Sequence, residues 1–307
     1  MTNDENKIGN FTSSIVIPFY GDSADAVALI SQLQRQKKYE QPIEIIISDD
    51  CSPEPFPELE GVRVVRRETN GGFGSAVNSG AEIATGKWLF ILNSDLTIPP
   101  DFIQRMVEKG EEYGEALISP QVVDHEGRGQ WVGRKFPTTF HYGWEWFTAL
   151  ARFRHTSWWQ RAVGHDLSCV TGKTATPDWA IGACMMLPTQ TFKDLGGFDQ
   201  RFFMNCEEVD LQRRLAERGI PRVFAGDITV EHVGGGSSGE NKQRRQWVTD
   251  ARFIYADKWN EQKHLKQVLT GISYLNYAVN KLREKRNPAV NAREILNYEL
   301  SFVKGQP

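Results

Sequence analysis

Short apolar runs rich in isoleucine and valine alternate with helix-like segments over the first 120 residues of the chain. The runs are typical of buried strands, because they are short and bounded by turn residues. The segments between them carry apolar residues at helical spacing, such as Leu29 and Leu33. The expected strands are Ser13–Tyr20, Ile43–Ser48, Val62–Arg66 and Trp88–Leu92, and the expected helices are Ala24–Arg35, Ser75–Ala84 and Pro100–Tyr113. This alternation predicts βαβ units, and therefore an α/β fold with a mostly parallel sheet flanked by helices.

The second half of the chain is organised differently. Residues 121–178 show no regular pattern and are rich in aromatic side chains. Order returns with an expected strand at Trp179–Leu187, a helix after Thr189, an acidic helix and a strand at Ile228–Glu231. From Asn241 onward the pattern is helical. We therefore expect an aromatic-rich insertion in the α/β domain and a C-terminal helical appendage.

A polar cluster follows three of the expected strands. Asp49 and Asp50 follow the second strand, Asn70–Gly74 follow the third, and Asn93–Asp95 follow the fourth. Ligands of open α/β sheets bind outside the carboxyl ends of the strands. We therefore expect these clusters to form a binding site at one end of the sheet.

The composition limits the class of protein. With 40% hydrophobic residues, a chain of 307 residues can bury a large core. A net charge of -3 argues against general nucleic-acid binding, which usually shows as a basic excess. The four cysteines form no CxxC pair, so neither a disulfide framework nor a zinc knuckle is indicated. The N-terminus lacks the apolar segment of a secretory signal, and no apolar run approaches the roughly 20 residues of a spanning helix. The expectation is a cytoplasmic protein, soluble or bound to one face of a membrane.

Three carboxylates crowd the predicted start of the acidic helix. Glu207, Glu208 and Asp210 lie on its first turn, after a phenylalanine-rich loop. The helix dipole stabilises acids at this end by roughly 0.3–1 kcal/mol each, but adjacent like charges offset part of that gain. A solvated helix start is one explanation of the cluster. A site in which one carboxylate accepts a proton and the others hold it in place explains the charge density better.

Asp95 and His232 each follow a predicted strand and are candidate metal ligands. Mg²⁺ and Mn²⁺ favour oxygen ligands and are often held by one or two carboxylates together with substrate phosphates. Asn93 is close enough in sequence to assist Asp95. The glycine- and serine-rich loop after His232, with Ser237 and Ser238, could meet phosphate oxygens. A simple turn at Asp95 and a structural role for His232 are the alternatives.

The segment Asn70–Gly74 matches a dinucleotide-binding loop only in part. In the G-x-G-x-x-G spacing, Gly72 and Gly74 would be followed by a third glycine where this chain has Val77. Nicotinamide chemistry is therefore not indicated.

Taken in order, the motifs resemble the family 2 glycosyltransferases of the GT-A fold, in particular their bacterial rhamnosyltransferase-like branch. The motifs are IVIPFYG, ISDDCS, NGGFGSAVNSG, LNSD, GGFD, FFMNCEEVDLQRR and EHVGGGS, and they span residues 13–239 apart from the insertion. The QxxRW motif of processive membrane synthases does not occur. The resemblance implies a GT-A catalytic domain at 1–239, with a nucleotide-binding half at about 13–120 and an acceptor half at about 121–239, and a C-terminal helical region at 240–307.

The resemblance also implies roles for single residues. Glu208 matches the position of the family's catalytic base, with Glu207 and Asp210 as its flanking acids. Asp49 would read the nucleotide base, and Asp95 with His232 would hold Mg²⁺ or Mn²⁺ on the diphosphate. The other implied residues belong to the nucleotide pocket (Pro18, Tyr20, Asn70, Gly72 and Asn93) or to the acceptor site (Trp179, Gly182 and Arg214).

Three positions depart from the family pattern. Gly21 stands where the family has Asn, Ser94 where it has Pro, and Glu208 where it usually has Asp. The side chain of Glu208 is one methylene longer, and a change in reach near 1 Å can matter at a reacting centre.

The implied activity is an inverting transfer of a sugar from a nucleoside-diphosphate sugar to a hydroxyl of a glycan or lipid-linked glycan. The setting would be bacterial cell-surface polysaccharide synthesis, with dTDP-rhamnose as the first candidate donor. A UDP-sugar transferase of galactosyl or glucosyl type is the alternative within the same fold. A nucleotidyltransferase would need a basic phosphate-gripping loop, which IVIPFYGDSAD does not offer. A non-catalytic glycan-binding module is a further alternative.

The insertion and the appendage leave several partners open. The tryptophans of the insertion could stack on a sugar, meet a membrane face or form the core of a small subdomain, which we favour; they are Trp144, Trp146, Trp158 and Trp159. The basic stretch Lys281–Arg286 would suit anionic lipid on the inner face of the plasma membrane. A homodimer through the C-terminal helices and a solvated helix face are equally consistent with the sequence.

Overall fold

The structure is a computed structural model of the chain. It describes residues 12–36, 39–232, 241–287 and 289–304. Ser237 and Ser238 lie outside the described residues, so their expected contact with phosphate stays a prediction. Within the described residues, no helix is both long enough and apolar enough to cross a membrane.

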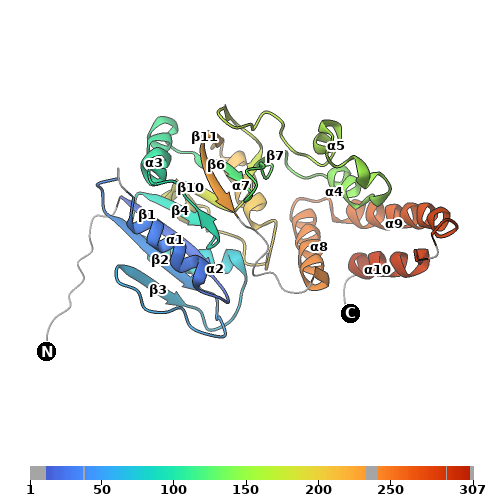
Figure 1. The fold of residues 1–307 in the computed structure, drawn as a ribbon, viewed down its shortest axis with the longest axis horizontal. Coiled ribbons are helices and arrows are strands. Elements are labelled where there is room, and N and C mark those ends of the chain that lie inside the picture. The colour runs from blue at the N-terminus through green and yellow to red at the C-terminus, as the bar shows by residue number, and fades with distance from the viewer. Residues whose placement is uncertain (1–11, 37–38, 233–240, 288, 305–307) are drawn as a thin grey trace.

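A nine-stranded sheet forms the centre of the molecule (Figure 1). Its strands are β1 (Ser13–Phe19), β2 (Ile43–Asp49), β3 (Val62–Arg66), β4 (Trp88–Leu92), β5 (Leu96–Thr97), β6 (Leu117–Val123), β8 (Thr174–Ala175), β10 (Cys184–Pro188) and β11 (Arg222–His232). Their order is β3-β2-β1-β4-β10-β6-β11-β5, with β8 paired to β11. Most strands run in one direction, whereas β5, β8 and β10 run antiparallel to their neighbours. The predicted α/β class with a mostly parallel sheet is confirmed.

Helices cover both faces of this sheet. They are α1 (Ala24–Gln34), α2 (Phe73–Ile83), α3 (Phe102–Tyr113), α6 (Thr189–Asp194) and α7 (Glu207–Glu217). Alternate residues of β1 enter two different cores. Ile15 and Ile17 pack with residues of α1 and α3, while Val16 packs with residues of α2, α6 and α7. Because strand side chains point to opposite faces in turn, one apolar strand serves both cores.

The strands and helices predicted for the first 120 residues are confirmed, with ends that shift by at most two residues. β6 was not predicted, because Pro120 and Gln121 interrupt its apolar pattern. Pro120 pairs with Ala225 next to the register shift in β11. Prolines inside sheets are confined to edges and to such irregular positions.

The predicted strand Trp179–Leu187 is two strands in the structure. β9 (Trp179–Ala180) pairs with β7 (Gly133–Arg134) in a small separate sheet, while β10 belongs to the central sheet. The acidic helix α7 begins at Glu207, and β11 starts earlier than the predicted strand at Ile228.

The aromatic insertion is helical where the sequence predicted irregular structure. It forms α4 (Thr139–Trp146), a 3₁₀ helix η1 (Thr148–Phe153) and α5 (Ser157–Ala162). Figure 1 shows these helices beside α8 (Asn241–Lys258), α9 (Gln262–Glu284) and α10 (Ala292–Lys304), on the side of the molecule opposite to β3. Tyr142 and Trp146 pack in one core with residues of all three C-terminal helices, and the indole N–H of Trp146 donates to Ser273 Oγ at 2.9 Å. The insertion and the C-terminal helices therefore share a core.

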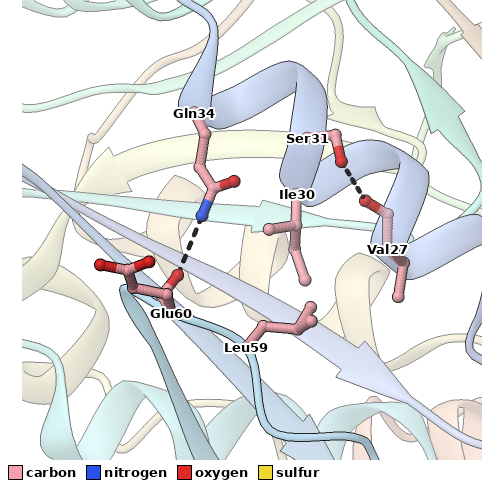
Figure 2. Close-up of a pocket in the computed structure, with 6 residues that line it drawn as sticks. All are labelled: Val27, Ile30, Ser31, Gln34, Leu59 and Glu60. Atoms are coloured by element: carbon pink, nitrogen blue, oxygen red, sulfur yellow. Dashed lines mark hydrogen bonds between the residues drawn. The ribbon is translucent and has the colours of Figure 1, made fainter.

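A cavity of about 370 Å³ lies between α1 and the loop before β3 (Figure 2). It is lined by Val27, Ile30, Ser31, Gln34, Leu59 and Glu60. The amide of Gln34 donates to the backbone oxygen of Glu60 at 3.0 Å across one side of it. The lining contains none of the predicted site residues, so this cavity is not the candidate active site.

Candidate active site

Asp95 and His232 are brought together by the pairing of β5 with β11. His232 is in register with Leu96, the residue after Asp95. Oδ1 of Asp95 lies 3.2 Å from Nε2 of His232, and the two side chains are only 18% and 14% exposed. Nδ2 of Asn93 lies 3.1 Å from the same imidazole nitrogen. The two predicted metal ligands and Asn93 thus form one cluster at the end of β4.

Gln130 orients the imidazole of His232. The Nδ1 atom of His232 lies 3.0 Å from Oε1 of Gln130, an oxygen that can only accept a hydrogen bond. The amide nitrogen of Gln130 donates to the backbone oxygen of His232 at 2.7 Å. In this arrangement Nδ1 donates to Gln130, and the lone pair of Nε2 accepts from the amide nitrogen of Asn93. A metal-binding histidine usually donates its other N–H to such a partner.

The donor atoms of this cluster fit a hard divalent cation. They are a carboxylate, an imidazole nitrogen and Oδ1 of Asn93, a buried atom that has no hydrogen-bond partner in the described part of the chain. Carboxylate and amide oxygens suit Mg²⁺ and Mn²⁺, and an imidazole can complete the set. The described residues contain no group of three or more His, Cys, Asp or Glu side chains that could hold a metal ion. A cation here would therefore take its other ligands from water or substrate.

Asp49, the predicted reader of the nucleotide base, is fully buried at the end of β2. Its carboxylate accepts hydrogen bonds from the backbone N–H groups of Ser52, at 2.8 Å, and Phe56, at 3.2 Å. The guanidinium of Arg66 also donates to it. Although burial raises the pKa of Asp49, these hydrogen bonds outweigh it and hold the pKa below the usual 3.8. The contact with a base stays a prediction, and it requires part of this network to open.

Asp50 belongs to a polar cluster expected at the binding site, without a predicted role of its own, and in the structure it holds the loop that follows β3. Its carboxylate accepts hydrogen bonds from the backbone N–H groups of Gly71, at 3.0 Å, and Gly72, at 2.7 Å. The Nε atom of Arg67 pairs with it at 2.8 Å. Asn70 in the same loop is exposed, and its predicted role in nucleotide binding is untested.

The glycines of this loop allow it to approach the segment before α7. Gly72 has a φ of +83°, and a side chain there would collide with the backbone oxygen of Phe203. A Cβ atom on Gly74 would lie 3.5 Å from Cβ of Glu207. Gly72 therefore has a clear structural reason to be glycine, and its predicted nucleotide contact stays a prediction.

The carboxylates at the start of α7 lie in different surroundings. Asn205 and Cys206 adopt left-handed backbone angles, with φ of 70° and 67°, directly before the helix. Glu207 is buried on the side of α2, next to Gly74. Glu208 lies over the turn between β9 and β10, where a Cβ atom on Gly182 would be 3.4 Å from its Cβ. Gly182, a predicted acceptor residue, therefore makes room for Glu208.

Glu208 lines a cavity of about 90 Å³ between β7, α4, α7 and α8. The cavity is lined by Arg134, Lys135, Pro137, His141, Tyr142, Glu145, Val163, Trp179, Asn205, Cys206, Glu208, Val209, Val248 and Arg252. Trp179, another predicted acceptor residue, is among them, whereas Glu207, Asp210 and Arg214 are not. Glu208 therefore faces this cavity, and its two flanking acids do not line it.

Burial raises the pKa of both glutamates at the start of α7. The pKa of Glu207 rises well above 4.5, through burial first and the charge of Glu208 second. Burial also raises the pKa of Glu208, and the positive charge of Arg134 opposes this rise. The Oε2 atom of each side chain is buried without a hydrogen-bond partner among the described residues. A cavity-lining carboxylate with a raised pKa and an unbonded oxygen is suited to accept a proton.

Asp210 and Arg214 belong to an ion-pair network that faces away from this cavity. Nε of Arg214 donates to Oδ2 of Asp210 at 2.9 Å, and its terminal nitrogens donate to two carbonyls of residues 195–197 at 2.7 and 2.8 Å. The ammonium of Lys258 on α8 lies 2.8 Å from both the Asp210 and the Asp199 carboxylate. This network fixes α7 between the GGFD segment and α8. The predicted catalytic and acceptor roles of Asp210 and Arg214 stay predictions.

The turn between β9 and β10 links the strand end that leads to Asp95 with Glu208. The backbone N–H of Asn93 donates to the carbonyl of Ala183 at 2.9 Å. Gly182, the preceding residue, is the one over which Glu208 lies. At the end of β1, Pro18 is half-buried and Tyr20 is 43% exposed, and their role in a nucleotide pocket is likewise untested.

Four charged or polar residues of the site region escaped sequence analysis. Gln130, Arg134 and Glu145 come from the insertion, and Arg252 comes from the C-terminal appendage. No local pattern marks them, because their chemistry depends on neighbours from distant parts of the chain. The only signal in the sequence is that the insertion is basic in places, with Arg134 and Lys135 among its aromatic residues.

Comparisons with known proteins support the same reading. The profile of glycosyl transferase family 2 matches residues 14–171, just over half of the chain. An N-acetylglucosaminyl-diphospho-decaprenol L-rhamnosyltransferase of Mycobacterium tuberculosis is 24% identical over 219 residues, which cover 66% of this chain and 70% of the relative. The O-antigen biosynthesis protein RfbC of Myxococcus xanthus is 26% identical over 230 residues, 71% of this chain but only 17% of that protein.

Solved structures share the fold at low sequence identity. S. aureus TarS 1-349 aligns with a TM-score of 0.53 at 14% identity, over 96% of this chain and 92% of that one. Against a longer TarS chain the present chain spans 43% of the length. GalNAc-T7, solved with UDP, GalNAc and Mn²⁺, aligns with a TM-score of 0.55 at 16% identity, over 84% of this chain and 52% of that one. These neighbours have the GT-A fold, as the sequence motifs implied. The chain belongs to the family 2 glycosyltransferases, and its similarity within them is to rhamnosyltransferases.

Proposed function

We propose that this glycosyltransferase moves a sugar, with dTDP-rhamnose as the first candidate donor, to a hydroxyl of a glycan or lipid-linked glycan in bacterial cell-surface polysaccharide synthesis. The name of the M. tuberculosis relative supports rhamnose and a lipid-linked acceptor. The observation that carries the proposal is that Glu208 lines a cavity and that one of its oxygens has no hydrogen-bond partner among the described residues. Glu208 also lies against the β9–β10 turn, to which the backbone of Asn93 is hydrogen-bonded.

In the proposed reaction, Glu208 accepts the proton of the acceptor hydroxyl while the hydroxyl oxygen attacks the anomeric carbon of the donor. The bond between that carbon and the diphosphate oxygen breaks, and its electron pair leaves with the nucleoside diphosphate. Attack opposite to the leaving group inverts the anomeric centre. A positioned general base typically accelerates such a step by roughly 10²–10⁴-fold.

Asp95 and His232 would hold a divalent cation, Mg²⁺ or Mn²⁺, with Oδ1 of Asn93 as a further oxygen donor. Such a cation neutralises negative charge on a departing diphosphate. Gln130 would hold the imidazole ring of His232 in orientation for this purpose, and a cation would replace the Asn93 amide at Nε2. Metal dependence rests on this fit of donor atoms.

Incubation with a panel of labelled sugar nucleotides tests the proposal. The panel contains dTDP-rhamnose, UDP-glucose and UDP-galactose, each with Mg²⁺ or Mn²⁺ and a lipid-diphosphate-linked N-acetylglucosamine acceptor. We expect one donor to be consumed with formation of an inverted glycoside and release of the nucleoside diphosphate. Preference for a UDP-sugar would redirect the donor assignment. Transfer of the nucleotidyl group, or no product from any donor, would refute the proposed function.

We also propose that α9 supplies a contact with an anionic lipid surface. Tyr274, Leu275 and Leu282 on this helix are 54%, 58% and 64% exposed, and Lys281 and Lys285 beside them are exposed too. An exposed apolar stripe flanked by lysines is typical of helices that lie in a membrane interface. We expect the protein to float with phosphatidylglycerol vesicles, and the double variant L275S/L282S to remain at the bottom. A mass that doubles with protein concentration, without flotation, would instead indicate a homodimer through this face.

A further inference from the structure

The cavity beside Glu208 contains more charge than a general base requires. Its charged lining residues are Arg134 and Lys135 on or after β7, Glu145 on α4, Glu208 on α7 and Arg252 on α8. His141 and Tyr142 of α4 and Cys206 before α7 are the other titratable groups around it, and Glu207 lies beside Glu208 on α7. Arg134, Lys135 and Arg252 are the cations of this lining that could offset the negative charge of Glu208.

Two of the three cations are committed to other carboxylates. Nη2 of Arg252 lies 2.6 Å from Oε2 of Glu145. The ammonium of Lys135 lies 3.0 Å from Asp166 and 3.7 Å from Asp178. None of these three ion pairs includes Glu208.

Arg134 is the cation that remains. Its side chain makes no ion pair within 4.0 Å in the described part of the chain, and only its Nε atom donates a hydrogen bond, to the carbonyl of Trp131 at 3.3 Å. The pairing of β7 with β9 sets Arg134 opposite Trp179, and its guanidinium lies 5.2 Å from the centre of that ring. Backbone pairing and the indole face therefore fix Arg134 at the wall of the cavity that Glu208 lines.

We propose that Arg134 is a positioning residue of the transferase, which keeps Glu208 in its carboxylate form so that Glu208 can accept the acceptor proton. This inference rests on the proposed function of Glu208. Burial favours the protonated acid of Glu208, which cannot act as a base. Backbone hydrogen bonds at the start of α7 and the charge of Arg134 oppose this rise of the Glu208 pKa, and Arg134 acts on Glu145 as well as on Glu208.

The arrangement assigns a task to the insertion. Arg134 lies at the cavity because β7 pairs with β9. Trp179 of β9 in turn packs in one core with residues of α7 and α8. The insertion therefore contributes to the chemistry of the base as well as to the shared core with the C-terminal helices.

The first test measures unfolding and needs no substrate. The free energy of unfolding is compared at pH 5 and pH 8 for wild type, E208Q, R134Q and the double variant, with the exposed Arg161 of the same insertion as the control, R161Q. If Arg134 compensates the buried charge, E208Q stabilises the R134Q background more than it stabilises wild type at pH 8. We expect about a tenfold larger gain in the folded-to-unfolded ratio, the equivalent of one pKa unit. Equal gains in both backgrounds at pH 8 would overturn the inference.

The second test measures the pH dependence of transfer with the donor that the panel identifies. In R134Q, the acidic limb of the pH profile of kcat should shift to higher pH by roughly one unit or more. The KM for the donor should stay unchanged. R134K should restore most of the limb, because it keeps the charge. An unshifted limb in R134Q would overturn the inference and leave the proposed function standing. A wild type without turnover on any donor would refute the proposed function, while the unfolding comparison would still decide the link between Arg134 and Glu208.

Discussion

The two acidic clusters of this glycosyltransferase differ in how their side chains are satisfied. In the first cluster, the imidazole of His232 contacts Asp95, Asn93 and Gln130 at 3.0 to 3.2 Å. Glu207 is buried and its neighbour Glu208 is half-buried, and one oxygen of each lacks a partner among the described residues. Polar side chains surround the imidazole in the first cluster, whereas burial opposes charge in the second. The difference suits a site that binds a cation in one case and a site that takes up a proton in the other.

The largest expected effect is that of Glu208→Gln on turnover. A glutamine cannot accept the acceptor proton, so we expect kcat to fall by roughly 10²–10⁴-fold while donor binding is kept. Glu207→Gln is the matched control, since Glu207 does not line the cavity, and should retain most of the activity. Steady-state kinetics on both variants decides the assignment. Near wild-type turnover in E208Q would show that another group is the base.

The next effect concerns the Asp95–His232 cluster. Asp95→Ala removes the only carboxylate of the cluster, so we expect Mn²⁺-dependent binding of dTDP to weaken by at least roughly 10–100-fold, the loss that even outer partners of a metal ligand cause. Isothermal titration calorimetry with and without Mn²⁺ provides the measurement. An unchanged affinity in the presence of Mn²⁺ would contradict the ligand role and remove the contrast between the clusters.

A smaller effect is expected for Gln130→Ala. This variant leaves Asp95 and His232 in place but releases the Nδ1 proton of the imidazole from its acceptor. We expect Mn²⁺-dependent dTDP binding to weaken by roughly tenfold, the lower end of what such partners contribute. Gln104→Ala, at a half-buried glutamine on α3 whose amide donates to Glu108, is the control. Equal affinities in the two variants would mean that Gln130 serves the fold alone.

The smallest expected effect concerns Glu207 in the second cluster and is measured as the free energy of unfolding. The folded chain binds the proton of Glu207 more tightly than the unfolded chain, whose carboxyl titrates near 4.5. The charged form therefore destabilises the fold increasingly as the pH rises above about 4.5, at about 1.4 kcal/mol for each unit of difference in pKa. We expect Glu207→Gln to be more stable than wild type at pH 8, with the gain vanishing toward pH 4. Thermal unfolding across this range measures it, and a gain that is independent of pH would contradict a buried charge at Glu207.

Much of the nucleotide-binding half could be predicted from the sequence. Its strands are short apolar runs with clear ends, and its helices show apolar residues at helical spacing, so local pattern and tertiary fold agree. The motif at Glu207–Asp210 also led to the correct helix. The insertion could not be predicted in the same way. Tyr142 and Trp146 lie four residues apart on α4, but their partners come from α8, α9 and α10, and no local signal announces such packing.

The sequence predicted which residues belong to the candidate site better than it predicted how they are arranged. Asp95 and His232 were both selected, yet their contact depends on the short β5–β11 pairing. Glu207, Glu208 and Asp210 were grouped as neighbours in sequence, and their different surroundings depend on α2, α4 and α8. The balancing cations lie outside every motif, because the charge around a buried carboxylate is a property of the folded chain.

The central claim is that the Asp95–His232 cluster and the cavity of Glu208 serve one reaction. A crystal structure of the protein with Mn²⁺ and dTDP tests it most directly, through the anomalous signal of the metal. The account predicts an anomalous peak bound by Asp95 and His232 and shared with the diphosphate, with Glu208 facing the same cleft. A peak at other residues, or a diphosphate bound on a face that Glu208 does not share, would contradict it.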